Sequence, residues 1–233
     1  MTSDIRPIWP AGASQEHIEA RIELARAEQQ LHGQLWDIAA ARHRLPPGPV
    51  LGDYHLAEGP ADLGLDAPVT STPLSELFGE HDTLFIYHLM FHPDDDAACP
   101  MCSLWVDGLH GVAHHIAQHA AFVVVAKAPL PKLRGWALRR GWDGLRVLSS
   151  HGTTFNADMN AETPDGAQVP MVSVLRAEGG QVRHVVSQIA NFTDGSEGAN
   201  DLLTPLWHVL DLLPEGRGDW YAANDYPGRA RGC

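Results

Sequence analysis

Two cysteines three positions apart are the residues of this sequence best suited to chemistry, in the segment Cys99-Pro100-Met101-Cys102. Proline is favoured in the first turn of a helix, where a backbone N–H has no intrahelical partner, so Pro100 predicts a helix that begins at the pair. The unpaired N–H groups and the dipole of that helix favour a thiolate at Cys99 and lower its pKa below about 8.5. Cys102, one turn further on, faces the same side and can attack a mixed disulfide formed at Cys99. The spacing therefore predicts dithiol–disulfide chemistry.

Charged residues near the pair act in opposite directions on this thiolate. The aspartates at positions 94–96 would raise the pKa of Cys99 if they lie close to it. Lys127 follows a strand predicted over residues 121–126, and His92 follows a strand predicted over residues 83–91. Because parallel strands end at a common edge of a sheet, we expect Lys127 and His92 near Cys99. Lys127 is a candidate to stabilise the thiolate, and a solvated surface lysine is the alternative.

A metal site is the main chemical alternative for the cysteine pair. The histidines downstream come close to zinc-finger spacing: His110, His114, His115 and His119. On a continuous helix His110, His114 and His115 lie one to three turns from the sulfurs, too far to share one ion with both. We therefore expect no metal and no bound cofactor. The sequence has no Gly-x-Ser-x-Gly elbow, P-loop or Gly-x-Gly-x-x-Gly motif. Two inert buried thiols at a helix start remain a further alternative.

The elements that must position the pair follow from the hydrophobic pattern. Residues 83–91 and 121–126 are nearly all apolar and predict strands buried on both faces. A helix is expected between them over 99–119, so the segment forms a parallel strand–helix–strand unit with a right-handed crossover. A second helix over 129–140, with Gly141 as its stop, leads to a short strand at 145–148.

The rest of the chain adds an antiparallel edge and terminal segments. Alternation in residues 171–176 and 182–187, joined by a Gly-Gly turn, predicts a β-hairpin. A final amphipathic helix is expected over 201–213. Residues 46–82 are rich in Pro, Gly and Asp and are expected to be mostly loop, with one short helical turn at Leu74–Phe78.

The predicted domain organisation is simple. Residues 1–13 read as an irregular arm, 14–214 as a single domain and 215–233 as an irregular tail. The domain includes an N-terminal helix over 14–44, capped by Ser14. This helix has apolar residues on one side, so it should lie on the surface of its own core or of a partner chain.

Composition limits the partners. Asp and Glu total 29 against 16 Lys and Arg, giving a formal charge of −13. This balance argues against nucleic-acid and anionic membrane partners. No apolar run reaches the roughly 18 to 20 residues of a membrane span, and the first residues lack a secretory signal pattern, so a cytoplasmic location is expected. The third cysteine, Cys233, is expected to be a thiol without a role.

Several motifs together resemble the DUF899 family, bacterial thioredoxin-like proteins of unassigned function. The resemblance extends over roughly residues 14–218 and rests on these segments: Tyr87-His88-Leu89-Met90-Phe91, Cys99-Pro100-Met101-Cys102-Ser103-Leu104-Trp105, Arg42-His43-Arg44-Leu45-Pro46, Leu74-Ser75-Glu76-Leu77-Phe78, Val123-Val124-Val125-Ala126-Lys127-Ala128-Pro129-Leu130, Phe155-Asn156-Ala157-Asp158, Val172-Ser173-Val174 and Leu210-Asp211-Leu212-Leu213-Pro214. The chain departs from the family pattern after Asp158, where Met159-Asn160-Ala161 replaces aromatic-rich sequence.

The resemblance implies a thioredoxin-like α/β fold, with a mixed central sheet between helical layers and Cys99 as nucleophile. Such folds place a cis-proline beside the cysteine pair, just before a core strand. Pro170 is the candidate, and an ordinary trans-proline is the alternative. We expect a thiol–disulfide oxidoreductase whose electrons come from a thiol protein or a small thiol. A non-catalytic binding module, whose N-terminal helix packs on a partner or on a second copy, and a peroxide reductase are the alternatives.

Overall fold

The computed structural model describes residues 7–65, 68–196 and 198–226. The chain divides into two compact units, residues 1–46 and 47–233. The first unit contains one long helix, α1 (Gln15–His43). The hydroxyl of Ser14 accepts a hydrogen bond from the N–H of His17, which confirms Ser14 as the N-cap. The helix ends at Arg44, two residues before a run of prolines.

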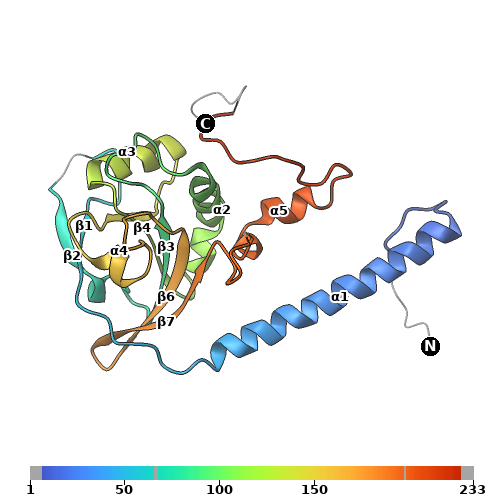
Figure 1. Ribbon diagram of the computed structural model, residues 1–233, viewed down its shortest axis with the longest axis horizontal. Coiled ribbons are helices and arrows are strands. Elements are labelled where there is room, and N and C mark those ends of the chain that lie inside the picture. Colours follow the sequence, from blue (N-terminus) through green and yellow to red (C-terminus); the bar gives the residue numbers. More distant parts are fainter. Residues whose placement is uncertain (1–6, 66–67, 197, 227–233) are drawn as a thin grey trace. The chain divides into compact units, whose positions relative to one another are not determined.

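The second unit is built on a seven-stranded mixed sheet with the order β2-β1-β5-β4-β3-β6-β7 (Figure 1). Its strands are β1 (His55–Glu58), β2 (Thr70–Pro73), β3 (Thr83–Leu89), β4 (Ala121–Ala126), β5 (Arg146–Ser149), β6 (Met171–Glu178) and β7 (Gln181–Ile189). β3, β4 and β5 are parallel, whereas β6 is antiparallel to β3 and pairs with β7 as a hairpin. The predicted parallel unit and antiparallel edge are both confirmed.

Two helices connect the parallel strands, α2 (Pro100–Ile116) and α3 (Leu130–Arg140). Both crossovers step in the same direction along the sheet, so equal handedness places both helices on one face. Leu109 of α2 and Leu133 of α3 accordingly share a core cluster with Tyr87 and Val124 of the sheet. Figure 1 shows the two helices together on that side.

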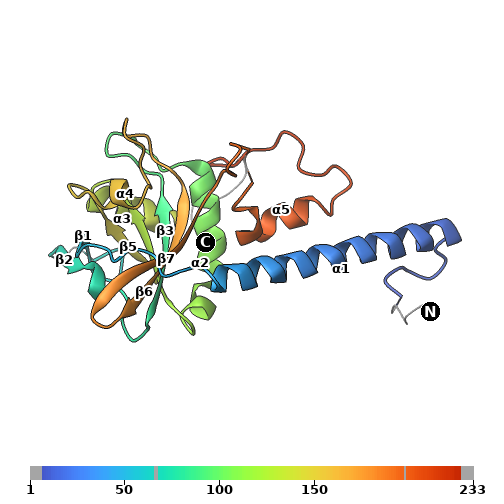
Figure 2. The same cartoon turned by 60° about the horizontal axis from the view of Figure 1, so that its bottom comes forward.

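The opposite face of the sheet is covered by shorter elements. A one-turn helix, η1 (Leu74–Glu76), and α4 (Phe155–Asp158) pack there on the other set of strand residues, among them Ile86 and Val125. The sheet therefore lies between two helical layers, and the fold is thioredoxin-like, as the sequence predicted. In Figure 2 the β6–β7 hairpin, drawn in orange, forms one edge of this sheet.

Several local predictions from glycine positions and apolar runs are confirmed. Gly141 ends α3 in the left-handed conformation, with φ of 72°. Gly179 and Gly180, with φ of 59° and 76°, form the turn of the hairpin. Residues 121–126 form β4 with the bounds that the apolar run predicted.

Two segments differ from expectation. The predicted loop over 46–82 contains β1 and β2, which pair with each other and extend the sheet beyond β5. The single helix predicted over 201–213 is divided into η2 (Asp201–Leu203) and α5 (Pro205–Leu210). Pro205 causes the break, because the residue before a proline is driven out of the helical region and Thr204 has φ −126° and ψ 136°.

The described part of the C-terminal segment, from 215 to 226, has no helix or strand, and Cys233 lies outside the described residues. Among the described helices, none combines the length and the apolarity that a bilayer crossing requires.

Candidate redox site

The cysteine pair lies where strand β3 passes into helix α2. Cys99 is the N-cap of α2, and Pro100 occupies the first helical position, as predicted. The N–H of Cys99 donates a hydrogen bond of 3.0 Å to the carbonyl of Met90, just beyond the end of β3. The carbonyl of Cys99 in turn accepts the N–H of Ser103 at 2.9 Å. These two bonds close the base of the 90–98 loop and fix the first cysteine at the helix start.

The two thiols have different exposure and opposite ionisation. Cys99 is half-buried, Cys102 is only 1% exposed, and both are free thiols. Hydrogen bonding from the Cys102 side chain lowers the pKa of Cys99 to about 6, helped by the backbone amides of Cys102 and Met101 and opposed by burial. Cys99 is therefore mostly a thiolate at neutral pH, which is the reactive form of a cysteine.

Cys102 has the complementary state. Its hydrogen bond to Cys99, its burial and the negative charge of Cys99 raise the pKa of Cys102 well above the ordinary value. The backbone of Met90 and the hydroxyl of Tyr87 act in the opposite direction through hydrogen bonds. One helical turn thus holds a partly accessible thiolate above a buried, protonated thiol.

Tyr87 is a site residue that sequence reasoning missed. It lies on β3 with 1% exposure, and its hydroxyl is hydrogen-bonded to Cys102. Burial, followed by the charge and the hydrogen bond of Cys102, raises the pKa of Tyr87 well above its ordinary value. The signal in the sequence was a tyrosine in the largely apolar strand that precedes the cysteine pair.

Lys127 and His92 have partners other than Cys99. Lys127, directly after β4, forms an ion pair with Glu162, and both side chains are mostly buried. His92 Nδ1 accepts the N–H of Asp94 at 3.2 Å and lies 3.6 Å from its carboxylate. The lowered pKa of Cys99 arises from Cys102 and two backbone amides rather than from these side chains.

Pro170 directly precedes β6, as predicted, but its peptide bond is trans. No peptide bond is cis anywhere in the three described ranges. Nearby Gln168 accepts the N–H of Phe91 through Oε1 at 2.7 Å, which joins the segment before β6 to the segment after β3. The trans alternative therefore holds for Pro170.

A second missed contact comes from the C-terminal segment. The side-chain amide of Asn224 donates a hydrogen bond of 3.0 Å to the carbonyl of Ala98, the residue before Cys99. Arg140 Nη1 of α3 donates to the carbonyl of Asn224 at 3.2 Å. The sequence shows this segment only as irregular, because a contact over 126 positions leaves no periodic pattern.

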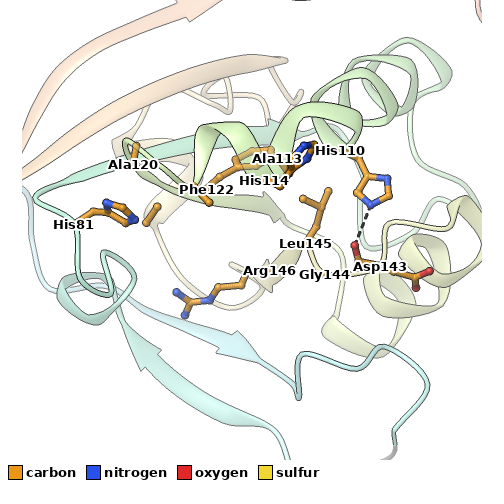
Figure 3. A pocket seen from close by; sticks show the side chains of 12 residues that line it. His81, His110, Ala113, His114, Ala120, Phe122, Asp143, Gly144, Leu145 and Arg146 are labelled. Carbon is orange, nitrogen blue, oxygen red and sulfur yellow. Dashed lines mark hydrogen bonds between the residues drawn. The ribbon is translucent and has the colours of Figure 1, made fainter.

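The histidines considered as zinc ligands lie elsewhere. His110 and His114 line a pocket of about 430 Å³ at the far end of α2, beside the starts of β4 and β5 (Figure 3). His110 Nε2 lies 2.9 Å from the carbonyl of Asp143, and the rings of His114 and His115 have centroids 3.8 Å apart. No cluster of three or more His, Cys, Asp or Glu suited to a metal ion occurs among the residues that the structure describes.

Solved structures with a similar chain path include a peroxiredoxin, a peroxidoxin and a putative thioredoxin reductase. A reduced 2-Cys peroxiredoxin from Plasmodium vivax has 11% identity and a TM-score of 0.48, covering 67% of this chain and 91% of its own. A peroxidoxin, BcpB, from Mycobacterium tuberculosis has 17% identity and a TM-score of 0.47, with 62% and 85% covered. A putative thioredoxin reductase from Burkholderia cenocepacia has 16% identity and a TM-score of 0.49, with 68% and 96% covered.

No curated protein matches the sequence. The family model described as "Bacterial protein of unknown function (DUF899)" matches residues 8–228. The sequence motifs between Arg42 and Pro214 resemble the same family, and the match extends over nearly the whole chain. The chain is therefore a member of the DUF899 family.

Proposed function

We propose that this protein is a thiol–disulfide oxidoreductase in which Cys99 is the nucleophile and Cys102 the resolving thiol. The observation that carries the proposal is the divided ionisation of the pair. The pKa of Cys99 is lowered to about 6 at a half-buried position, while the pKa of Cys102 is raised in the interior. Two inert buried thiols would both have raised pKa values, because burial disfavours the charged form.

The proposed reaction has two exchange steps. The thiolate of Cys99 attacks one sulfur of a substrate disulfide, forms a mixed disulfide and releases the other sulfur as a thiolate. Cys102 then loses its proton and attacks the Sγ of Cys99, which breaks the mixed disulfide and releases the second substrate sulfur. The substrate gains two electrons and two protons in all. The protein is left with a Cys99–Cys102 disulfide, which an external thiol reduces.

The position of the pair suits this sequence of events. Cys99 is the more accessible sulfur, so a bulky substrate meets the ionised thiol first. Cys102 is held one turn away, so its attack is intramolecular and needs no second collision. Because Cys102 is protonated while Cys99 is charged, the two sulfurs do not compete for the substrate.

The direct test is the reduction of insulin disulfides by the purified protein with dithiothreitol as electron donor. We expect turnover by the wild-type chain, loss of at least about a hundredfold in Cys99→Ser, and unchanged turnover in Cys233→Ser as the matched cysteine control. Equal activity of wild type and Cys99→Ser would overturn the assignment. A parallel assay with hydrogen peroxide separates the peroxide reductase. Absence of both activities, together with an ordinary pKa of Cys99, would support the binding module instead.

A further inference from the structure

Tyr87 points to the same side of the sheet as the cysteine pair. Side chains alternate along a strand, and Tyr87 belongs to the core cluster that contains Cys102, whereas the preceding residue, Ile86, belongs to the cluster on the other face. Tyr87 and Cys102 are each 1% exposed, so water is excluded from both. In that dry environment the hydroxyl of Tyr87 has the sulfur of Cys102 as its hydrogen-bond partner.

The protonation state required of Cys102 changes during the proposed reaction. While Cys99 is a thiolate, it accepts a hydrogen bond from Cys102 and repels a second negative charge, so Cys102 keeps its proton. Once Cys99 is bonded to a substrate sulfur, that charge is gone. Cys102 must then become a thiolate in a buried site, where desolvation is costly. The groups still hydrogen-bonded to it are the backbone of Met90 and the hydroxyl of Tyr87.

We infer that the hydroxyl of Tyr87 stabilises the Cys102 thiolate during release of the mixed disulfide, and that Tyr87 is a catalytic residue of the second step. The inference rests on the function proposed above. Tyr87 acts as a donor and keeps its own proton, because its pKa is raised by burial and by the nearby sulfur. The proton of Cys102 passes to the first substrate thiolate or to solvent, so the hydroxyl makes no net proton transfer.

The kinetic test uses Tyr87→Phe, which removes the oxygen and keeps the ring in the core. In a single turnover with a disulfide peptide, acid quench and mass spectrometry follow the mixed disulfide at Cys99. We expect an unchanged first step and a second step slowed by about tenfold or more, since a hydrogen bond to a charged group has about that effect. The pH profile of the second step should move to higher pH.

The matched control is Tyr54→Phe. Tyr54 also donates its hydroxyl to an acidic partner, Asp158 Oδ2 at 2.9 Å, but it belongs to the opposite face of the sheet. We expect both steps to be unchanged in this variant. If Tyr87→Phe slows the two steps equally, or if Tyr54→Phe slows the second step as much, Tyr87 acts through packing and the inference is wrong.

A measurement that needs no turnover separates this inference from the proposed function. In a Cys99→Ala background, the pKa of Cys102 is read from its ¹³Cβ chemical shift, which tyrosine ionisation does not obscure. Adding Tyr87→Phe should raise that pKa, and replacing tyrosine by the more acidic 3-fluorotyrosine should lower it. An unchanged pKa overturns the role of Tyr87 whatever the activity. A shifted pKa in a protein without disulfide or peroxide turnover overturns the proposed function alone. If Tyr87→Phe does not fold, the fluorotyrosine protein still decides the question.

Discussion

Strand β3 carries two neighbouring buried residues with titratable side chains, one on each face of the sheet. Tyr87 faces α2 and is hydrogen-bonded to Cys102, whereas His88 faces Phe155, with ring centroids 5.8 Å apart. His88 Nε2 lies 2.9 Å from the hydroxyl of Ser173 on β6. Both residues are nearly inaccessible, with exposures of 1% and 2%.

The difference lies in what each residue contacts. Burial lowers the pKa of His88 to about 3, so its ring is neutral at physiological pH, and its hydroxyl partner does not change charge. From Ser173 the hydrogen bonds continue to Ser187 at 2.8 Å and from there to His184 at 2.8 Å. This network joins three strands, β3, β6 and β7, and contains no ionised nucleophile. Burial of a titratable group therefore does not by itself indicate a reactive site. The difference is that Tyr87 contacts a group whose charge changes during the proposed reaction, whereas His88 does not.

The largest effect on the face of the sheet that carries Tyr87 and the cysteine pair is expected for Cys102→Ala. Turnover should fall by about a hundredfold or more, because the mixed disulfide at Cys99 then lacks its internal thiol. The pKa of Cys99 should also rise above about 6, since its largest stabilising hydrogen bond comes from the Cys102 side chain. Thiolate absorbance at 240 nm and trapping of the mixed disulfide measure the two effects. Rapid turnover without Cys102 would mean that resolution comes from another thiol.

The opposite face is tested by His88→Gln, which keeps a side-chain polar group but cannot take up a proton. The pKa of His88 is about 3 in the folded chain and about 6.5 in the unfolded chain. Between these two pH values the unfolded chain binds a proton at His88 and the folded chain does not. The wild type should lose about 1.4 kcal/mol of stability per pH unit from this group as pH falls below 6.5. We expect a shallower acid dependence in the variant, by about 2 kcal/mol between pH 6.5 and 4.5, in urea unfolding. Turnover at pH 7 should stay within about twofold. A large loss of activity in a folded variant would remove the contrast between the faces.

Lys127→Met tests whether a distant cation contributes to the thiolate. Because Lys127 is paired with Glu162, we expect the rate of Cys99 alkylation by iodoacetamide to rise through pH about 6 in both wild type and variant. Stability should fall by about 1 kcal/mol or more, since a mostly buried carboxylate loses its partner. A higher pKa of Cys99 in the variant would restore Lys127 as a stabilising group.

The smallest effect is expected for His114→Ala in the pocket at the far end of α2. This site shares its helix with the cysteines but none of their contacts. Turnover should remain within about twofold, and the free energy of unfolding within about 0.5 kcal/mol. A clear loss of turnover would show that the two ends of α2 are coupled.

Much of the scaffold could be predicted because its signals are local. The apolar runs identified β3 and β4, Pro100 identified the start of α2, and a Gly-Gly pair identified the hairpin turn. β1 and β2 were missed because each has only four residues, and both lie in a segment rich in turn-forming residues. The division of the last helix could have been predicted from Pro205, because proline lacks a backbone N–H and interrupts a helix at an interior position.

By itself the sequence determined that two thiols stand at the amino end of a helix after a buried strand. This follows from short-range rules: the continuous apolar run of a buried strand, the place of proline in a first turn, and the unpaired amides of a helix start. Only the tertiary structure decided which groups surround those thiols. Tyr87 beneath Cys102, Glu162 beside Lys127 and Asn224 against Ala98 are contacts between segments far apart along the chain. Such contacts depend on how the layers of the fold pack against each other. Packing between distant segments produces no regular residue spacing that could be recognised in a single sequence.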